Sequence, residues 1–153
     1  QAWVLNSQST AMSRYVGVPV RSLAVIGGKV LGIGEDGMYE MTGDKDNGVN
    51  ISSSVKTGKS MMGFEALKNL GDVVISYVCA GVMQVRISCY GGPVEGTYTY
   101  NMPVREAKSP RGNRLVPGKG MRSRYYQFEF YSASASFGVD TVTADVAVNA
   151  RRI

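Results

Sequence analysis

The sequence predicts an all-β protein, an antiparallel β-sandwich or open barrel preceded by an N-terminal β-meander. Its 153 residues include 19 glycines and 5 prolines, a density that is typical of many short strands and turns. Apolar and polar residues alternate over several short segments, with turns about every ten residues. No apolar run is long enough for a membrane-spanning helix, so we expect no membrane insertion.

The clearest segment, residues 20–42, predicts three strands joined by tight turns. Gly27 and Gly28 separate the first two strands, and glycine reaches the positive φ that both central positions of a two-residue hairpin require. A Glu-Asp-Gly turn then leads into a third strand at residues 38–41. Together these strands form the predicted meander.

A polar, turn-rich stretch at residues 43–50 suggests a boundary between two parts of the chain. We therefore expect a meander segment at residues 1–50, including a short strand at residues 3–6, and a β-sandwich domain at residues 51–153. The two parts could also form one continuous domain.

In the second part, residues 72–89 predict a hairpin around Ala80-Gly81. Its return strand alternates between apolar and polar residues, which indicates one buried and one wet face. The apolar set is Met83, Val85, Ile87 and Cys89. The two cysteines, Cys79 and Cys89, should not lie opposite each other, so we expect two core thiols and no disulfide.

Further strands are predicted at residues 51–57, 97–102, 122–131 and 141–148, with one possible helical turn within residues 61–70. Residues 103–120 predict a long basic connection. In the strand at 122–131, one face should carry Tyr126, Phe128 and Phe130, and the other Tyr125, Gln127, Glu129 and Tyr131. In the last strand the inward residues should be Val142, Ala144, Val146 and Val148.

Charge is unevenly distributed along the chain, which carries 17 basic and 12 acidic residues. Residues 35–46 hold five acids against one lysine, and residues 105–124 hold seven basic residues against Glu106. The basic set is Arg105, Lys108, Arg111, Arg114, Lys119, Arg122 and Arg124. Such a segment is typical of a solvated loop, of contact with an acidic protein surface or, as the least expected case, of nucleic-acid binding.

Aromatic residues near these arginines leave another alternative open. The outward tyrosines, Tyr125 and Tyr131, could stack on sugar rings or on single-stranded nucleic acid. Aromatic residues are also common on half-buried sheets, so ordinary strand composition explains them as well.

Nothing in the sequence indicates catalysis. Histidine is absent, which removes the commonest general base near neutral pH and the commonest metal ligand. The pattern G-x-G-x-x-G occurs at Gly32–Gly37, but a short strand follows it where a dinucleotide site needs a helix. The segment Asp44–Gly48 resembles the start of a calcium loop, yet Val55 stands where the loop needs glutamate. We therefore expect no catalytic residue, metal site or cofactor.

Taken in order, several segments resemble the C-terminal part of a tail-associated virion structural protein of a tailed bacteriophage. The most specific is the segment at residues 120–130, Gly-Met-Arg-Ser-Arg-Tyr-Tyr-Gln-Phe-Glu-Phe, followed by the closing Arg151-Arg152-Ile153. The others are Trp3-Val-Leu-Asn6, Ser13-Arg14-Tyr15, the meander at 22–41, Val55-Lys-Thr-Gly58 and Met62-Gly-Phe64. The chain departs from the resemblance at residues 132–138, where a more acidic, asparagine-rich turn is expected.

The resemblance implies a non-enzymatic part of a tail, baseplate or tail tip that acts in virion assembly and in host attachment. Its partners would be other copies of the chain, other tail proteins and a host-surface glycan. It would be made in the host bacterial cytoplasm and located in the virion tail. We expect the contacts between subunits to involve Arg105, Arg111, Arg114, Lys119, Arg122, Arg124, Tyr125 and Tyr131. The alternatives are a carbohydrate-binding, receptor-binding module and nucleic-acid binding through residues 105–124.

Overall fold

A computed structural model describes most of the chain, and its described residues form strands and turns without a helix. They are residues 2–10, 12–15, 17, 19–43, 45–46, 48–93, 95–106, 111–118, 120–133 and 135–148. The all-β prediction is therefore confirmed. Within these residues, no helix is present that could cross a bilayer.

The chain divides into two compact units, Gln1–Gly43 and Asp44–Ile153. In the first unit, β1 (Ala2–Leu5) pairs with β2 (Met12–Tyr15), and a separate three-stranded sheet follows. That sheet consists of β3 (Val20–Ile26), β4 (Lys29–Gly34) and β5 (Met38–Glu40). The predicted meander is confirmed. Gly27 and Gly28 have φ values of +59° and +79°, as the tight turn between β3 and β4 requires.

Among the directly paired residues of the three-stranded sheet, one face carries no charge; Arg21 lies at the register shift between Val20 and Ser22. Directly paired residues share a face, so Leu23 and Gly32 lie on the same side as Tyr39, and Val25 lies there beside Val30. We call this side, with Val20, the apolar face. Its members Leu23, Val25 and Val30 are 63%, 72% and 44% exposed. The opposite face also exposes Ile26 and Met38, but it carries an ion pair of 3.0 Å between Lys29 and Glu40.

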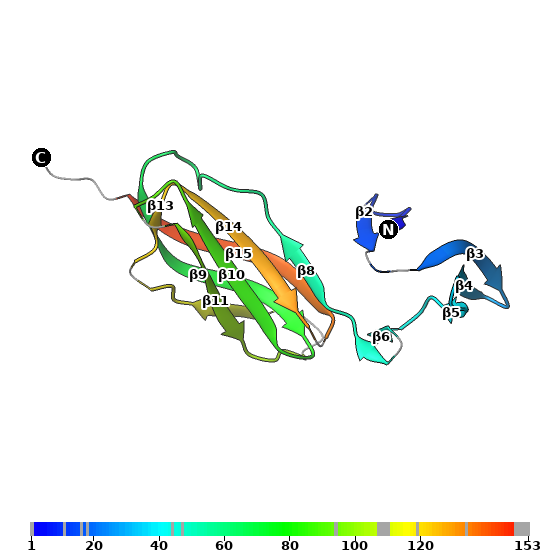
Figure 1. The fold of residues 1–153 in the computed structure, drawn as a ribbon. Coiled ribbons are helices and arrows are strands. Elements are labelled where there is room, and N and C mark those ends of the chain that lie inside the picture. Colours follow the sequence, from blue (N-terminus) through cyan, green and yellow to red (C-terminus); the bar gives the residue numbers. More distant parts are fainter. Residues whose placement is uncertain are drawn as a thin grey trace, which may run out of the picture. The chain divides into compact units, whose positions relative to one another are not determined.

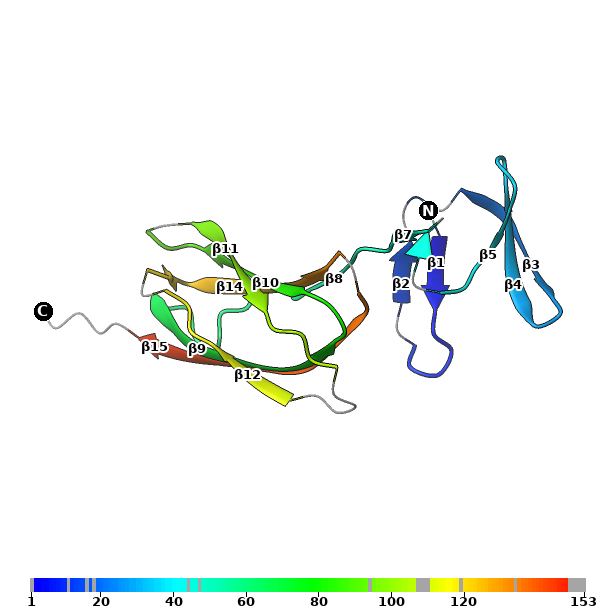
Figure 2. The ribbon, with the colours of Figure 1, turned by 90° about the horizontal axis from the view of Figure 1, so that it is seen from below.

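The second unit is a sandwich of two antiparallel four-stranded sheets, one above the other in Figure 2. The first sheet has the order β11-β10-β14-β8, and these strands lie side by side in Figure 1. In the second sheet β9 is central, with β15 along one side and β12 and β13 also paired to it. The strands of the sandwich are β8 (Ser53–Lys56), β9 (Lys68–Cys79), β10 (Met83–Tyr90), β11 (Gly96–Met102), β12 (Arg111–Leu115), β13 (Arg122–Ser123), β14 (Tyr125–Ser132) and β15 (Phe137–Val148). Two short strands of two residues each, β6 (Lys45–Asp46) and β7 (Val49–Asn50), pair with each other and precede the sandwich in the sequence.

The core lies between the two sheets and follows the predicted alternation. The inward residues of β10 and β14 are at most 4% exposed, and they include both the Met83–Cys89 set and the row of Tyr126, Phe128 and Phe130. β9 contributes Val73, Ile75, Tyr77 and Cys79 from the other sheet. Cys79 and Cys89 are buried free thiols, as expected. Burying such side chains stabilises the fold by about 1.5–3 kcal/mol each.

The predicted hairpin at residues 72–89 is wrong. β9 and β10 belong to different sheets, and the three residues between Cys79 and Met83 carry the chain across the core. Two strands that each bury one side fit two arrangements: they can be hydrogen-bonded neighbours in one sheet, or they can pack against each other from opposite sheets. The alternation of apolar and polar residues shows which side of a strand is buried, but not which strand it pairs with.

Four further expectations need correction. The predicted strand at residues 122–131 is interrupted at Arg124, because β13 pairs with β9 in one sheet and β14 pairs with β10 in the other. The basic connection contains a strand, β12, that pairs with β9. Residues 61–67 form turns and bends without a helix, and Val148 is 50% exposed at the end of β15.

Candidate functional site

The two outward tyrosines of β14 lie on the outer face of the first sheet, as predicted. In the register of β10 with β14, Tyr131 is opposite Gln84, and Tyr125 is opposite Tyr90. Between them, Glu129 is opposite Arg86. The result is a face with aromatic rings toward both ends and polar side chains in the middle.

The ring of Tyr131 is covered by a cation of the same sheet. The guanidinium carbon of Arg86 lies 4.5 Å from the centroid of the ring. Arg86 also forms an ion pair of 3.5 Å with Glu129. Sugar stacking requires an open ring face, and here a cation–π contact occupies part of it.

At the other end of this face, the tyrosines are held by hydrogen bonds and by a lysine. The hydroxyl of Tyr125 donates to Oε1 of Glu65 at 2.8 Å, and this hydrogen bond raises the pKa of the phenol. The hydroxyl of Tyr90 donates to Gln127 at 3.1 Å, while Nζ of Lys59 lies 4.0 Å from the centroid of the Tyr90 ring. The outer face is therefore a network of internal contacts.

The predicted basic residues are distributed over different parts of the sandwich. Arg114 points outward from the second sheet and forms an ion pair with Asp72, so it lies on the opposite side of the sandwich from Tyr125 and Tyr131. Arg124 is exposed where the chain changes sheets. The backbone of Arg111 pairs with Tyr77, but its side chain lies outside the described part, as does the whole of Lys119.

Arg105 and Arg122 are partly buried, and Nε of each is a buried donor without a hydrogen-bond acceptor among the described atoms. The backbone of Arg105 pairs with that of Cys79, and its guanidinium reaches Oδ1 of Asn113 at 3.5 Å. Nearby, burial raises the pKa of the Tyr77 phenol, and the neighbouring Arg105 opposes that shift. These arginines contribute to the packing of the sandwich and do not extend freely from a loop.

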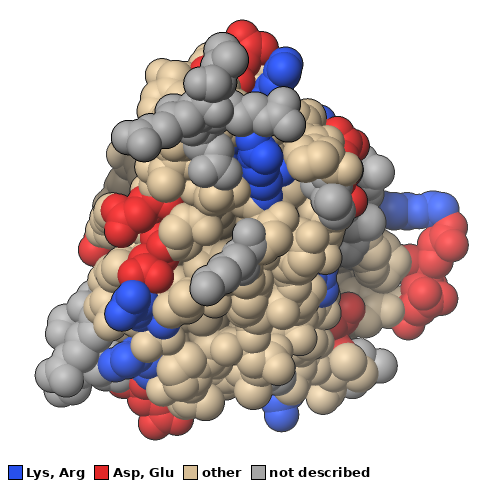
Figure 3. Space-filling model, turned by 90° about the vertical axis from the view of Figure 1, so that its left-hand side faces the viewer, with Lys and Arg blue, Asp and Glu red and all other residues tan. Residues whose placement is uncertain are grey.

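The charges do not form a single basic surface in the view of Figure 3. Among the described side chains visible there, Lys and Arg are interspersed with Asp and Glu, and uncharged residues separate them. Nucleic-acid binding depends on several cations that contact neighbouring phosphates. The separation along the sequence between acidic and basic segments is thus not reproduced on this face.

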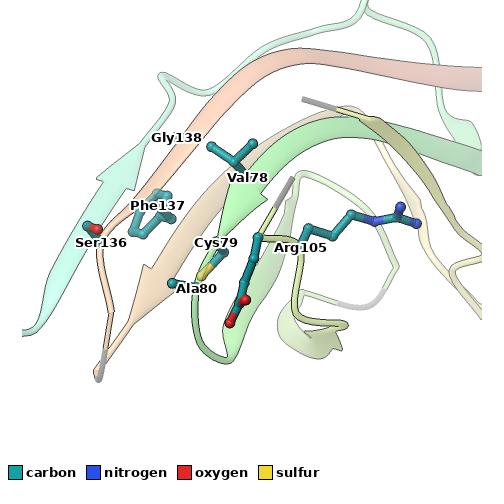
Figure 4. Close-up of a pocket in the computed structure, with 8 residues that line it drawn as sticks. Val78, Cys79, Ala80, Arg105, Ser136, Phe137 and Gly138 are labelled. Atoms are coloured by element: carbon teal, nitrogen blue, oxygen red, sulfur yellow. The ribbon is translucent and has the colours of Figure 1, made fainter. Parts of the chain in front are cut away.

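A hollow of about 500 Å³ lies where β9 ends and β15 begins. The guanidinium of Arg105 extends away from the side chains of Val78 and Phe137 (Figure 4). The described lining holds a single carboxylate, that of Glu106, whereas glycoside hydrolysis uses two. The lining residues are Val78, Cys79, Ala80, Arg105, Glu106, Ser136, Phe137 and Gly138. The described residues also include no cluster of three or more metal-ligating side chains.

A buried polar network at the start of β9 was missed by the sequence reasoning. Tyr126 is fully buried, and its hydroxyl donates to the carbonyl of Lys68 at 2.7 Å while accepting from Ser123 N at 3.1 Å. Lys68 is 0% exposed, and its Nζ donates to the carbonyls of Phe64 and Ala66 at 2.5 and 3.0 Å. Burial lowers the pKa of Lys68, with Glu65 opposing the shift. Through these hydrogen bonds, the turns at residues 62–66 are held against the buried core by Lys68.

The contacts of Arg86, Lys59 and Glu65 were also missed, because each joins residues that are far apart in sequence. Only the strand register brings Arg86 beside Tyr131. Comparison with known proteins found no matching family model, no matching curated protein and no matching solved structure.

Proposed function

We propose that the chain is a non-enzymatic structural component of a bacteriophage tail or baseplate, acting in virion assembly and in contacts that support host attachment. The resemblance described above motivates the tail assignment. The observation that carries the structural role is the exposed apolar face of β3–β5.

The described part of the first unit has no core of buried side chains. Among its described residues Gly32 alone is buried, so none of the side chains described in this unit is buried. Units of about 40 residues usually need disulfides, metals or association to be stable. Large exposed apolar surfaces mark interaction sites, and apolar side chains such as Leu23 and Val25 are covered at low desolvation cost by another protein surface. Repeated contacts between tail subunits would supply such a surface.

The geometry gives less support to the two alternatives. The glycan alternative needs free ring faces on the outer sheet, but Arg86 lies over Tyr131 and Lys59 lies over Tyr90. The nucleic-acid alternative needs convergent cations, but Arg114 is paired with Asp72 and points away from the face that carries Tyr125.

The test uses particles of the phage that encodes the chain. Mass spectrometry and electron microscopy of purified virions should find the chain in the tail, and its absence from intact virions would refute the proposal. Leu23→Asp places a charge on the apolar face, and we expect virions that lack the chain or fail to assemble. The matched control is Ser22→Asp, at an exposed position on the other face of β3, which should assemble normally.

A further inference from the structure

The edge strand β11 lacks the features that usually prevent pairing between sheets. It spans Gly96–Met102 with the sequence Gly-Thr-Tyr-Thr-Tyr-Asn-Met, which contains no charge and no proline. Its register with β10 runs without a shift from Gly96 to Met102. Among the described residues, no strand pairs with its other side. An edge of this kind is a template for the addition of another strand.

The other edges of the sandwich are protected. β8 has four residues and ends in Lys56, and β12 has five residues and includes two arginines. β15 is long, but two register shifts interrupt its pairing, and Asp140 and Asp145 lie close to them. Short length, charge and bulges are the usual protections of edge strands. Of the described edges of the sandwich, β11 is the one suited to pairing.

The sequence of β11 is suited to pairing with itself. An antiparallel arrangement centred on Thr99 pairs all seven residues, with Thr99 opposite the Thr99 of a second copy. Tyr98 then lies opposite Tyr100, and Gly96 opposite Met102. Tyr98 belongs to the inward row but is 36% exposed at the edge, so the pairing would cover it with an aromatic ring. Cross-strand aromatic pairs stabilise sheets, and an uncharged strand avoids repulsion between identical copies.

We propose that β11 of one copy pairs with β11 of a second copy around a two-fold axis, which joins two four-stranded sheets into one of eight strands. The inference rests on the proposed structural function, for which it identifies the surface where sister copies meet. The occupant is a second copy of this chain, because the strand is self-complementary over its whole length.

The test exploits the position of Thr99 on the two-fold axis. Thr99→Lys and Thr99→Glu each place two like charges directly opposite each other, which should weaken dimerisation of the full chain about fivefold or more. An equimolar mixture of the two variants places lysine opposite glutamate and should restore the dimer. Sedimentation equilibrium over a range of concentrations measures the dissociation constants. Recovery in the mixture depends on this register and would not follow from misfolding of either variant.

The matched controls are Thr143→Lys and Thr143→Glu, which change an exposed residue on the outward side of β15 and should leave the dimer unchanged. A monomeric wild-type chain, a dimer that persists in both Thr99 variants, or a mixture without recovery would each overturn the β11 interface. If virions contain the chain while any of these results is obtained, the tail function stands and this interface is rejected. If virions lack the chain, the proposed function fails whatever its state of association.

Discussion

Removing the hydroxyl of Tyr126 should destabilise the sandwich without opening a cavity, because Tyr126→Phe keeps the buried ring. The hydroxyl donates to the carbonyl of Lys68 and accepts from Ser123 N. The carbonyl of Met121 is 3.0 Å away, but it also accepts from Leu70 N at 3.1 Å. The substitution therefore removes one hydrogen bond from each of two buried groups. At about 0.5–1.5 kcal/mol for each hydrogen bond, we expect a loss of about 1–3 kcal/mol.

Urea unfolding followed by circular dichroism measures this loss. Most of the buried surface belongs to the sandwich, so the main transition reports on that unit. The matched control is Tyr125→Phe, which removes a hydroxyl bonded to Glu65 on the outer face and should leave the midpoint unchanged. Equal midpoints for Tyr126→Phe and the wild-type chain would refute the reasoning.

Two further predictions concern Lys68 and Gly92. Burial lowers the pKa of Lys68 in the folded chain below its value in the unfolded chain. Between these two pKa values the unfolded chain binds more protons than the folded chain, so the free energy of unfolding should rise with pH through that interval. Lys68→Met should remove this rise, which urea midpoints measured at increasing pH up to the ordinary lysine pKa of about 10.4 detect; equal slopes in both proteins would contradict it. Gly92→Ala should cost about 2 kcal/mol or more, because its Cβ would lie 2.2 Å from the carbonyl oxygen of Arg122. Gly118→Ala meets open space and should melt close to the wild-type temperature, so equal melting of the two variants would refute the predicted clash.

Local sequence patterns predicted the positions of the strands more reliably than they predicted which strands pair with each other. The two glycines at 27 and 28 fix the first turn of the meander, because few other residues adopt that backbone. Alternation likewise gave the buried rows of β10 and β14. It could not show that β9 and β10 face each other across the core, since a three-residue connection allows either arrangement.

At the candidate site, too, local features were predicted and long-range contacts were not. Alternation placed Tyr125 and Tyr131 on one wet face, which the structure confirms. The contact between Arg86 and Tyr131 depends on the pairing of β10 with β14, a long-range property that short sequence windows do not contain. The segment 105–124 reads as one basic unit in the sequence, but strand pairing directs Arg114 and Arg124 to separate places.

The order in which strands alternate between the two sheets has a consequence for synthesis of the chain. β9 pairs with β15 from Lys68 to Cys79, yet β15 leaves the ribosome after all the intervening strands. Pairings so distant in sequence form slowly, in milliseconds to seconds. A nascent chain must therefore carry β9 without its principal neighbour until β15 has been synthesised, and during that time β9 is exposed to chaperones and to other unfinished chains.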